Sequence, residues 1–247
     1  MKTVQHLTGF QVIELRRYTI KPGGREHFAR YFESYFPEAF EQLGAIAFGD
    51  FFERTKTDHF LWLRGFKDMD ARVIANSAFY FGPLWKEHRQ TLNDLILDSD
   101  DVLLLQPLHP DRGVLVLPAV DVVKEERGAT GIAVAQIFTV KAGEMDPLSA
   151  AAERAFEAYR GEDMKEAGVL VTLDAKNTFP QLPVRTDGPY LVWLGVFQDE
   201  QALDRFRTLA DRATQTLAAT GHLRGETELV VLDPAPRSRL RWLPSNP

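Results

Sequence analysis

The stretch Val12-Ile-Glu-Leu-Arg-Arg-Tyr-Thr-Ile-Lys-Pro-Gly23 predicts a β-strand that runs into a tight turn. Side chains alternate along a strand, so its two faces differ in character. One face is mainly aliphatic and carries Ile13, Leu15 and Thr19. The opposite face carries Glu14, Arg16 and Tyr18. A surface strand would rarely place such polar residues in a row opposite aliphatic ones. We therefore expect the aliphatic face to pack under helices and the polar face to line a cavity.

The residues that follow this strand predict the element order βαββαβ. Further strands are predicted at residues 45–53, 60–66 and 101–105. Apolar residues at helical spacing predict a helix from Phe28 to Leu43, which Pro37 kinks or splits. A second helix begins at Asp68 or Asp70 as its cap, breaks near Phe81-Gly-Pro83 and resumes through Ile96.

The same order recurs in the second half of the chain. Three segments of the first half match three of the second in the same sequence order, with offsets of 120, 131 and 127 positions: 18–23 with 138–143, 61–68 with 192–199, and 102–107 with 229–234. Helices of the second half are predicted at 148–167 and around Leu203 to Leu217. Three ordered matches at similar offsets indicate an internal repeat.

The repeat predicts an α+β fold made of tandem ferredoxin-like βαββαβ units, in which helices cover one face of each antiparallel sheet. The predicted parts are a first domain at 1–107, a linker at 108–130, a second domain at 131–234 and a tail at 235–247. The linker is expected to be exposed, with a short edge strand at 114–117. Because the other face of each sheet must also be buried, we expect the two sheets to face each other as an intrachain dimeric α/β-barrel-like arrangement.

Composition narrows the functional classes. The chain of 247 residues has 45% hydrophobic residues, enough for sizeable cores. A net charge of −6 argues against a general nucleic-acid binder. The absence of cysteine excludes disulfides, Cys-bound metals and thiol catalysis. No apolar run approaches the length of a membrane span, and residues 1–10 do not resemble a signal peptide, so a cytoplasmic protein is expected.

A family resemblance rests on several of these segments. It is carried by Glu14-Leu-Arg-Arg-Tyr18 with Lys21-Pro-Gly23, Leu43-Gly44, Trp62 to Asp68 with Arg72, and Leu84-Trp85. Over about residues 11–107 the chain resembles the NIPSNAP family, within the dimeric α/β-barrel superfamily. That superfamily includes cofactor-free monooxygenases, haem-binding dismutases and peroxidases, and isomerases. The resemblance implies the fold but no settled activity.

The candidate binding residues come from two strands expected to be central neighbours. Arg16 and Tyr18 on the first would lie near Trp62 and Arg64 on the third, facing the barrel interior together with Glu14. Arg forms paired, charge-assisted bonds with carboxylate or enolate groups, which favours an anion-holding pocket. The alternative is a structural Glu14–Arg16 ion pair. The second half carries Val134, Gln136, Phe138, Trp193 and Gly195 at these positions, so the halves are not equivalent and any site is expected to be biased toward the first half.

No metal site is expected, because none of the six histidines has a metal-ligand spacing. His88, one turn after Leu84-Trp85, is the candidate acid/base or haem ligand, and a partly buried structural histidine is the alternative. Residues 98–101, rich in Asp, predict a loop at a helix end. The apolar loop 175–189 is expected to cap a barrel opening, with Arg185 in a surface ion pair or joining a pocket.

Two functional hypotheses follow. The first is an enzyme without a bound cofactor, acting by proton transfer as an isomerase or monooxygenase on a small anionic aromatic or apolar molecule in the barrel interior. Glu14 or His88 would move the proton, Arg16 and Arg64 would hold the anion, and Tyr18 and Trp62 would form the walls. The second is a noncatalytic small-molecule-binding or scaffold protein. A haem protein is a third and weaker alternative. No nucleic acid or membrane partner is expected, and a homodimer could form through an outer surface.

Overall fold

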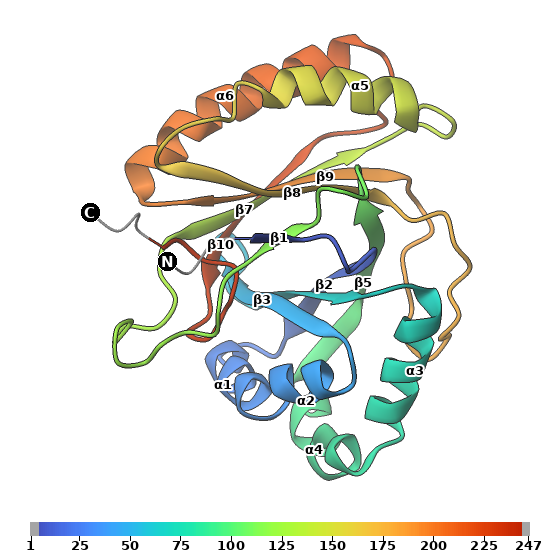
Figure 1. Ribbon diagram of the computed structural model, residues 1–247, viewed down its shortest axis with the longest axis vertical. Helices are drawn as coiled ribbons and strands as arrows, with labels where there is room; N and C mark the ends of the chain where they lie inside the picture. Colours follow the sequence, from blue (N-terminus) through green and yellow to red (C-terminus); the bar gives the residue numbers. More distant parts are fainter. Residues whose placement is uncertain (1–4, 244–247) are drawn as a thin grey trace.

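The computed structural model describes residues 5–243, and the ends of the predicted first domain and tail, residues 1–4 and 244–247, lie outside that part. Eight strands form a closed barrel in the order β10-β3-β4-β2-β5-β8-β9-β7 (Figure 1). The barrel consists of two four-stranded antiparallel sheets, one from each half of the chain. The mixed α+β fold with two ferredoxin-like units in one chain is therefore confirmed.

The first half supplies one sheet and four helices. Its strands are β2 (Val12–Ile20), β3 (Ile46–Glu53), β4 (His59–Phe66) and β5 (Ile96–Pro107). Its helices are α1 (Arg25–Tyr35), α2 (Pro37–Gln42), α3 (Met69–Tyr80) and α4 (Pro83–Asn93). Pro37 begins α2 and Pro83 begins α4, where a missing backbone N–H costs nothing. Asp68 caps α3 by accepting a hydrogen bond of 2.8 Å from the backbone N of Ala71.

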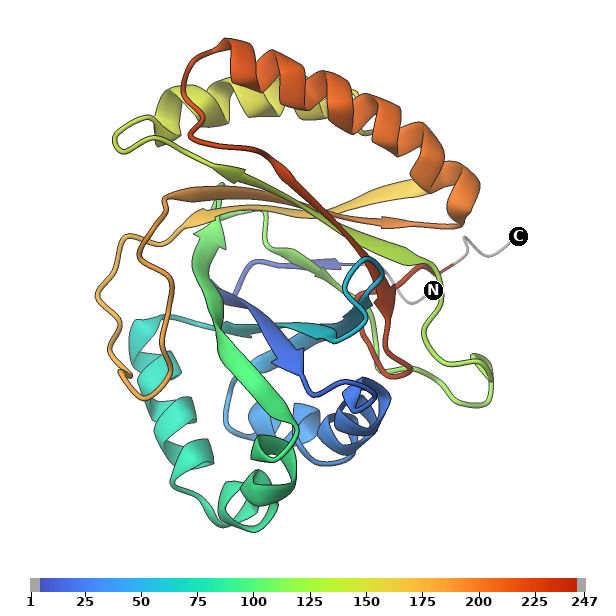
Figure 2. The same ribbon diagram turned by 180° about the vertical axis from the view of Figure 1, so that it is seen from behind.

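The second half supplies the other sheet. Its elements are β7 (Ile132–Thr139), α5 (Met145–Phe156), β8 (Met164–Thr172), β9 (Tyr190–Phe197), α6 (Glu200–Ala219) and β10 (Glu228–Pro234). The sheets join at two seams, where Leu105 to Pro107 pair with Leu170 to Thr172, and Leu232 to Pro234 pair with Phe51 to Glu53. Helices α5 and α6 cover one side of the barrel and α1 to α4 the opposite side (Figures 1 and 2).

The assignment of the two faces of β2 from the sequence is wrong. Ile13 and Leu15 belong to a core that combines inward residues of both sheets, including Ala135 and Val192. Tyr18 instead packs in the core between the first sheet and helices α1 to α4. The polar face of β2 therefore lies under the helices and the aliphatic face lines the barrel. Alternation shows which residues share a face but does not show which face points inward.

The barrel interior is filled by side chains and by a two-stranded ribbon. Strand β1 (Gln5–Leu7) pairs with β6 (Val114–Val116), and Val114 to Val116 are buried in the barrel core. Strand β6 contacts both β3 and β8, which lie on opposite sides of the barrel. The predicted exposed linker is thus partly buried, and its short strand is not an edge of the barrel. An interior ligand cavity would have to displace this ribbon.

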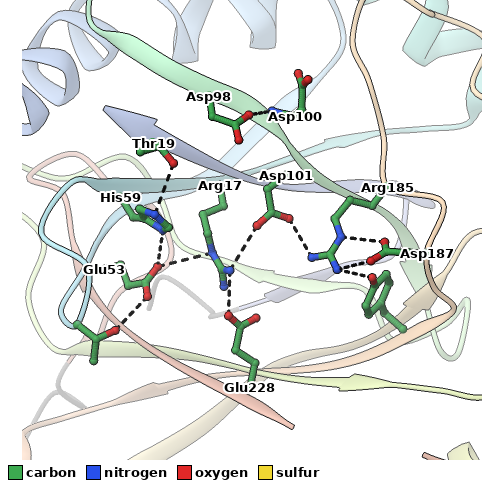
Figure 3. Close-up of polar contacts among 12 residues, drawn as sticks. Arg17, Thr19, Glu53, His59, Asp98, Asp100, Asp101, Arg185, Asp187 and Glu228 are labelled. Carbon is green, nitrogen blue, oxygen red and sulfur yellow. Dashed lines mark hydrogen bonds and ion pairs between the residues drawn. The ribbon is translucent and has the colours of Figure 1, made fainter. Parts of the chain in front are cut away.

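Beyond the C-terminal end of the aliphatic run of β2, the inward positions of the barrel are charged. Arg17 contacts Glu228 at 3.0 Å, Asp101 at 3.4 Å and Glu53 at 3.6 Å (Figure 3). Arg185 joins the network through Asp101 at 3.1 Å, so the expected surface ion pair of Arg185 is present. These contacts come from strands of both halves and hold the barrel end closed.

Three further segments can be compared with what the sequence predicts for them: helix α5, residues 98–101 and the tail. Helix α5 ends at Phe156 instead of continuing to Ala167, because β8 begins at Met164 to complete the second sheet. Asp98 to Asp101 lie within β5, at a register irregularity opposite Thr19, and not in a loop. The tail packs on the body, with Leu240 and Trp242 in the barrel core. No helix among residues 5–243 is both long and apolar enough to cross a bilayer.

Candidate functional site

A cavity of about 420 Å³ lies between the first sheet and its helices. Arg16, Tyr18 and Trp62 project into it from β2 and β4. Aromatic residues of the surrounding helices form most of its wall: Phe28, Phe32, Phe36, Phe40, Phe79, Tyr80 and Trp85. Such a concave, mostly apolar space with a few polar groups is typical of a small-molecule site. The predicted site residues therefore meet at a cavity, but outside the barrel.

An ion cluster lies beside this cavity. The carboxylate of Glu14 accepts hydrogen bonds from Arg16 Nη1 at 2.9 Å, Arg64 Nε at 2.7 Å and Arg72 Nε at 2.7 Å. None of the four side chains is more than 1% exposed. Glu14, Arg64 and Arg72 are not among the residues that line the cavity. One carboxylate thus orients three guanidinium groups, and Arg16 is the member that reaches the cavity.

The cluster carries more positive than negative charge. Among residues 5–243, no carboxylate other than that of Glu14 is in ion-pair contact with Arg16, Arg64 or Arg72. Aromatic faces compensate in part, because the Arg64 guanidinium carbon lies 4.9 Å from the Trp62 ring and 5.0 Å from the Phe40 ring. Three cations facing one anion leave a surplus of about two charges, which a buried site can tolerate only with such support or with a ligand.

The charges around Glu14 favour its ionised form. Burial alone would raise the pKa of Glu14, but the charges of Arg64, Arg16 and Arg72 outweigh burial and hold that pKa far below its usual range. The pKa of Arg16 is raised, since burial lowers it less than Tyr18 and Glu14 raise it. Glu14 therefore remains ionised at neutral pH and serves to position the guanidiniums. Proton transfer by Glu14 stays a prediction from the sequence.

Two donors are free to meet a ligand in the cavity. Arg16 donates from Nε to the Tyr18 hydroxyl at 2.9 Å, which leaves its Nη2 without a hydrogen bond to any residue in the described part of the chain. Trp62, which is 2% exposed, has no partner for its indole Nε1 within residues 5–243. A buried donor without a partner is costly, so these N–H groups suit an acceptor supplied by a ligand.

The mouth of the cavity is basic. Lys86 and Arg89 of α4 line it and are exposed, together with the polar residues Asn93 and Gln181. Neither cation forms an ion pair with another residue that the structure describes. Unpaired surface cations attract anions toward an opening, an effect that salt screens. The exposed rim of the cavity and its buried Arg16 therefore both carry positive charge.

The long connection between β8 and β9 closes one side of the cavity. Phe179 is buried, and its ring lies 6.0 Å from that of Tyr80. Asn177 Oδ1 accepts a hydrogen bond of 3.0 Å from Arg72 Nη1, which ties the loop to the ion cluster. This loop descends beside α3 in both views (Figures 1 and 2). The expected cap thus contacts the body. Phe179 covers the sheet–helix cavity, while Arg185 of the same loop lies at the barrel end.

His88 does not reach this cavity. It is largely buried on α4, where its Nδ1 lies 2.8 Å from the Tyr31 hydroxyl and its ring stacks on Tyr35 at 3.9 Å. These contacts attach α4 to α1. The geometry corresponds to the structural alternative for this histidine, so we assign it no role in the site.

Several residues of the site were missed from the sequence. Arg72 and Tyr80 of α3 entered no prediction about a pocket, and the loop that holds Phe179 was expected to cap a barrel opening and not this cavity. Arg72 carried a usable signal, because it shares the buried face of its helix with Ala75, Asn76 and Phe79. A charged residue at a core-facing helical position requires a buried partner. The contribution of the loop depends on how the halves pack, which no local pattern indicates.

The second half lacks an equivalent cavity wall. Gln136 pairs with Trp193 in the ladder as Arg16 pairs with Trp62, which confirms the positional match of the repeat. The Gln136 amide is satisfied by Tyr159 at 2.8 Å and Thr214 at 3.0 Å. The polar set of β2 and β4 is therefore a property of the first half alone.

Fold and site together define a two-unit dimeric α/β-barrel protein with a basic cavity under the helices of one unit. Residues 13–109 match the NIPSNAP family, which confirms the predicted resemblance over the half of the chain that holds the cavity. No curated protein sequence matches the chain.

Solved structures support the whole-chain architecture. An anthrone oxidase-like protein is 11% identical over 99% of this chain and 100% of its own, with a TM-score of 0.61. A proposed monooxygenase from Lactobacillus acidophilus NCFM is 13% identical over 91% of this chain and 94% of its own, with a TM-score of 0.58. An uncharacterised NIPSNAP-like domain protein from Burkholderia xenovorans is 22% identical over 44% of this chain and 97% of its own, with a TM-score of 0.37. At these identities the first two likenesses concern the fold alone.

Proposed function

We propose that this protein binds a small aromatic or apolar molecule through an anionic group in the cavity between the first sheet and helices α1 to α4. The observation that carries the proposal is Arg16, which is held by buried Glu14 and has an unused guanidinium nitrogen beside the cavity. The aromatic wall would contact the apolar body of the ligand. Trp62 would donate a second hydrogen bond from Nε1.

A small-molecule ligand explains the cluster better than a purely structural ion pair does. An isolated ion pair carries equal and opposite charges, whereas this cluster has three guanidiniums around one carboxylate. It also lies next to a cavity whose exposed rim is basic. A small anion supplies the missing negative charge at the point where Arg16 presents its free donor.

The second candidate function is catalysis on the bound anion by proton transfer, as an isomerase or a monooxygenase. It is favoured by the two full-length neighbours that are described as a proposed monooxygenase and an anthrone oxidase-like protein. In this candidate Arg16 would hold the substrate anion and Tyr18 would be the hydroxyl nearest to that guanidinium. Glu14 would position Arg16 without exchanging a proton.

Binding of two isosteric probes tests the proposal. 1-Naphthoate and neutral 1-naphthamide are titrated into the full chain, with quenching of the cavity tryptophans Trp62 and Trp85 and calorimetry as readouts. We expect naphthoate to bind at least about tenfold more tightly, and Arg16→Gln to remove that preference. Arg212→Gln, on the exposed face of α6, is the control that removes the same charge far from the cavity. Equal binding of both probes, or a preference that survives Arg16→Gln, would contradict the proposal.

A further inference from the structure

The surplus of positive charge narrows the class of ligand, on the assumption that the proposed binding site is correct. A carboxylic acid is already ionised at neutral pH and needs no help from the site. A phenol or an enol is largely neutral there, and nearby cations favour its anion. The cavity offers a buried cationic cluster, an apolar wall and two unused N–H donors, which together would stabilise a delocalised oxyanion more than its neutral parent.

We propose that the cavity takes up weakly acidic aromatic hydroxy compounds, phenols or enols, and binds them as oxyanions while their proton is released to solvent. The O–H bond of the ligand breaks, the electron pair stays on the ligand oxygen, and the proton leaves to water or buffer. The oxyanion then lies between Arg16 and Trp62, with its ring against the aromatic wall. No residue has to act as the base, because the cluster supplies the driving force.

The groups that face this position support oxyanion binding. Arg64 and Arg72 lie behind Arg16, and Arg64 Nη1 and Arg72 Nη2 have no hydrogen-bond partner among the described residues. Tyr80 of α3 lines the cavity, and burial raises its pKa, so its hydroxyl stays protonated. Glu14, the one carboxylate in ion-pair contact with these guanidiniums in residues 5–243, is occupied by all three of them. The field at the ligand oxygen is therefore set by cations.

The arrangement also distinguishes this site from the other charged cluster of the molecule. At the barrel end Arg17 faces three carboxylates, Glu53, Asp101 and Glu228, so the surplus there is negative (Figure 3). An oxyanion would be repelled from that end. The charge balance thus directs a weakly acidic ligand to the cavity under the helices and to no position near Arg17.

The test uses 4-nitrophenol, whose anion absorbs visible light and whose neutral form does not. The full chain is added at a pH about one unit below the midpoint of the free probe. We expect a saturable rise in phenolate absorbance, and a midpoint for the bound probe that lies about 1–3 pH units lower. Calorimetry in two buffers of different ionisation enthalpy should show release of about one proton per bound probe at low pH.

Two variants make the test specific. Arg16→Gln should return the midpoint toward that of the free probe, whereas Arg212→Gln should leave the shift unchanged. Arg16→Lys keeps the charge, and should retain part of the shift if the fold tolerates it. Circular dichroism and thermal melting establish whether each variant is folded. If Arg16→Gln does not fold, the shift measured for Arg16→Lys decides whether the midpoint depends on Arg16.

The outcomes separate this inference from the proposed function. If 4-nitrophenol quenches the cavity tryptophans but its bound spectrum remains that of the neutral form, oxyanion capture is overturned and binding in the cavity stands. If neither 4-nitrophenol nor naphthoate binds, the proposed function fails together with this inference. If naphthoate binds and 4-nitrophenol does not, the site takes carboxylates and the phenol or enol class is excluded.

Discussion

The two halves of the chain share a ladder register but use the space above the sheet in opposite ways. In the first half, the helical cover is broken between α3 and α4, and a cavity lies beneath it. In the second half, the single long helix α6 packs Leu203, Phe206 and Ala210 into the equivalent space. The two units therefore keep matching strands, while their helical layers fill the space above the sheet differently.

The two matching tryptophans show the same contrast at atomic detail. Trp193 donates from Nε1 to Glu166 at 3.1 Å, and its ring stacks on Phe206 at a centroid distance of 5.0 Å. Trp62 has no such partner in the described part of the chain and lines the cavity. Gly195, which stands where Arg64 stands in the first half, leaves room for the Trp193 ring. At this matched position the second half pairs its tryptophan N–H internally, and the first half leaves it available.

The largest expected effect comes from Glu14, whose counterpart in the second half is the apolar Val134. Glu14→Gln leaves three buried guanidiniums without an anion and should lower the free energy of unfolding by roughly 3–5 kcal/mol at pH 7. Urea denaturation measures it, and the double variant with Arg16→Gln should recover part of the loss. A loss below about 1 kcal/mol would mean that the guanidiniums do not need this carboxylate.

The pH dependence of this loss has a defined sign. Because the pKa of Glu14 is lowered in the folded state, its contribution is present above the ordinary carboxyl pKa near 4.5 and declines as the pH falls below it. The stability difference between the protein and Glu14→Gln should therefore be constant from about pH 6 to 8 and shrink toward acid.

A smaller effect is expected on the filled side of the comparison. A Cβ at position 195 would clash with the Trp193 ring, so Gly195→Ala should destabilise the second half by about 1–3 kcal/mol. Gly168→Ala, in the neighbouring strand β8, is the matched control, because its Cβ would meet atoms no closer than 3.6 Å. Thermal melts of both variants should differ clearly. Similar melting temperatures would show that the Trp193 ring moves aside easily.

The smallest predicted effect is a gain in stability in the first half. Asp50 and Val169 pair with Trp62 and Trp193 respectively, but Asp50 is a buried acid hydrogen-bonded to Glu33. Burial, together with the charge of Glu33, raises the pKa of Asp50 well above its usual range. The folded state then binds more protons than the unfolded state, so this site costs stability increasingly as the pH rises above about 4.

Asp50→Asn should remove that cost. We expect a gain of about 1–2 kcal/mol at pH 8 that vanishes near pH 4, measured by urea denaturation across this range. Val169 of β8 pairs with Trp193 as Asp50 pairs with Trp62, so Val169→Asn is the matched control and should give no such pH-dependent gain. A gain for Asp50→Asn that is the same at both pH values would exclude proton linkage as its cause.

Sequence patterns predicted the architecture more fully than the site. The repeat, the central pairing of β2 with β4 and the helix break at Pro83 all follow from local periodicity and turn chemistry. The set of Glu14, Arg16, Tyr18, Trp62 and Arg64 also shares one face as predicted. The sequence did not show whether that face points into the barrel or toward the helices. Both layers against the sheet are apolar, so the pattern of a strand with two buried faces does not distinguish them.

The remaining errors have a similar cause. The contact between Arg72 and Glu14 joins a helix to a strand 58 positions earlier, and Asn177 reaches Arg72 from the other half of the chain. Such contacts depend on how complete elements pack, and short-range periodicity contains no information about them. The residues of the proposed site are therefore joined by contacts between distant parts of the sequence.

The loop between β8 and β9 has a consequence for stoichiometry and for the tolerance of each half to change. It belongs to the second half, yet Phe179 and Leu182 complete the wall of the cavity in the first. Each chain should therefore saturate with a single equivalent of ligand, and exchange of that ligand should depend on both halves. Under α6 the second half is filled by Leu203, Phe206 and Ala210, whereas along this loop its residues are constrained by the cavity. The two repeated units therefore differ in role, and this one loop of the second unit completes the cavity of the first.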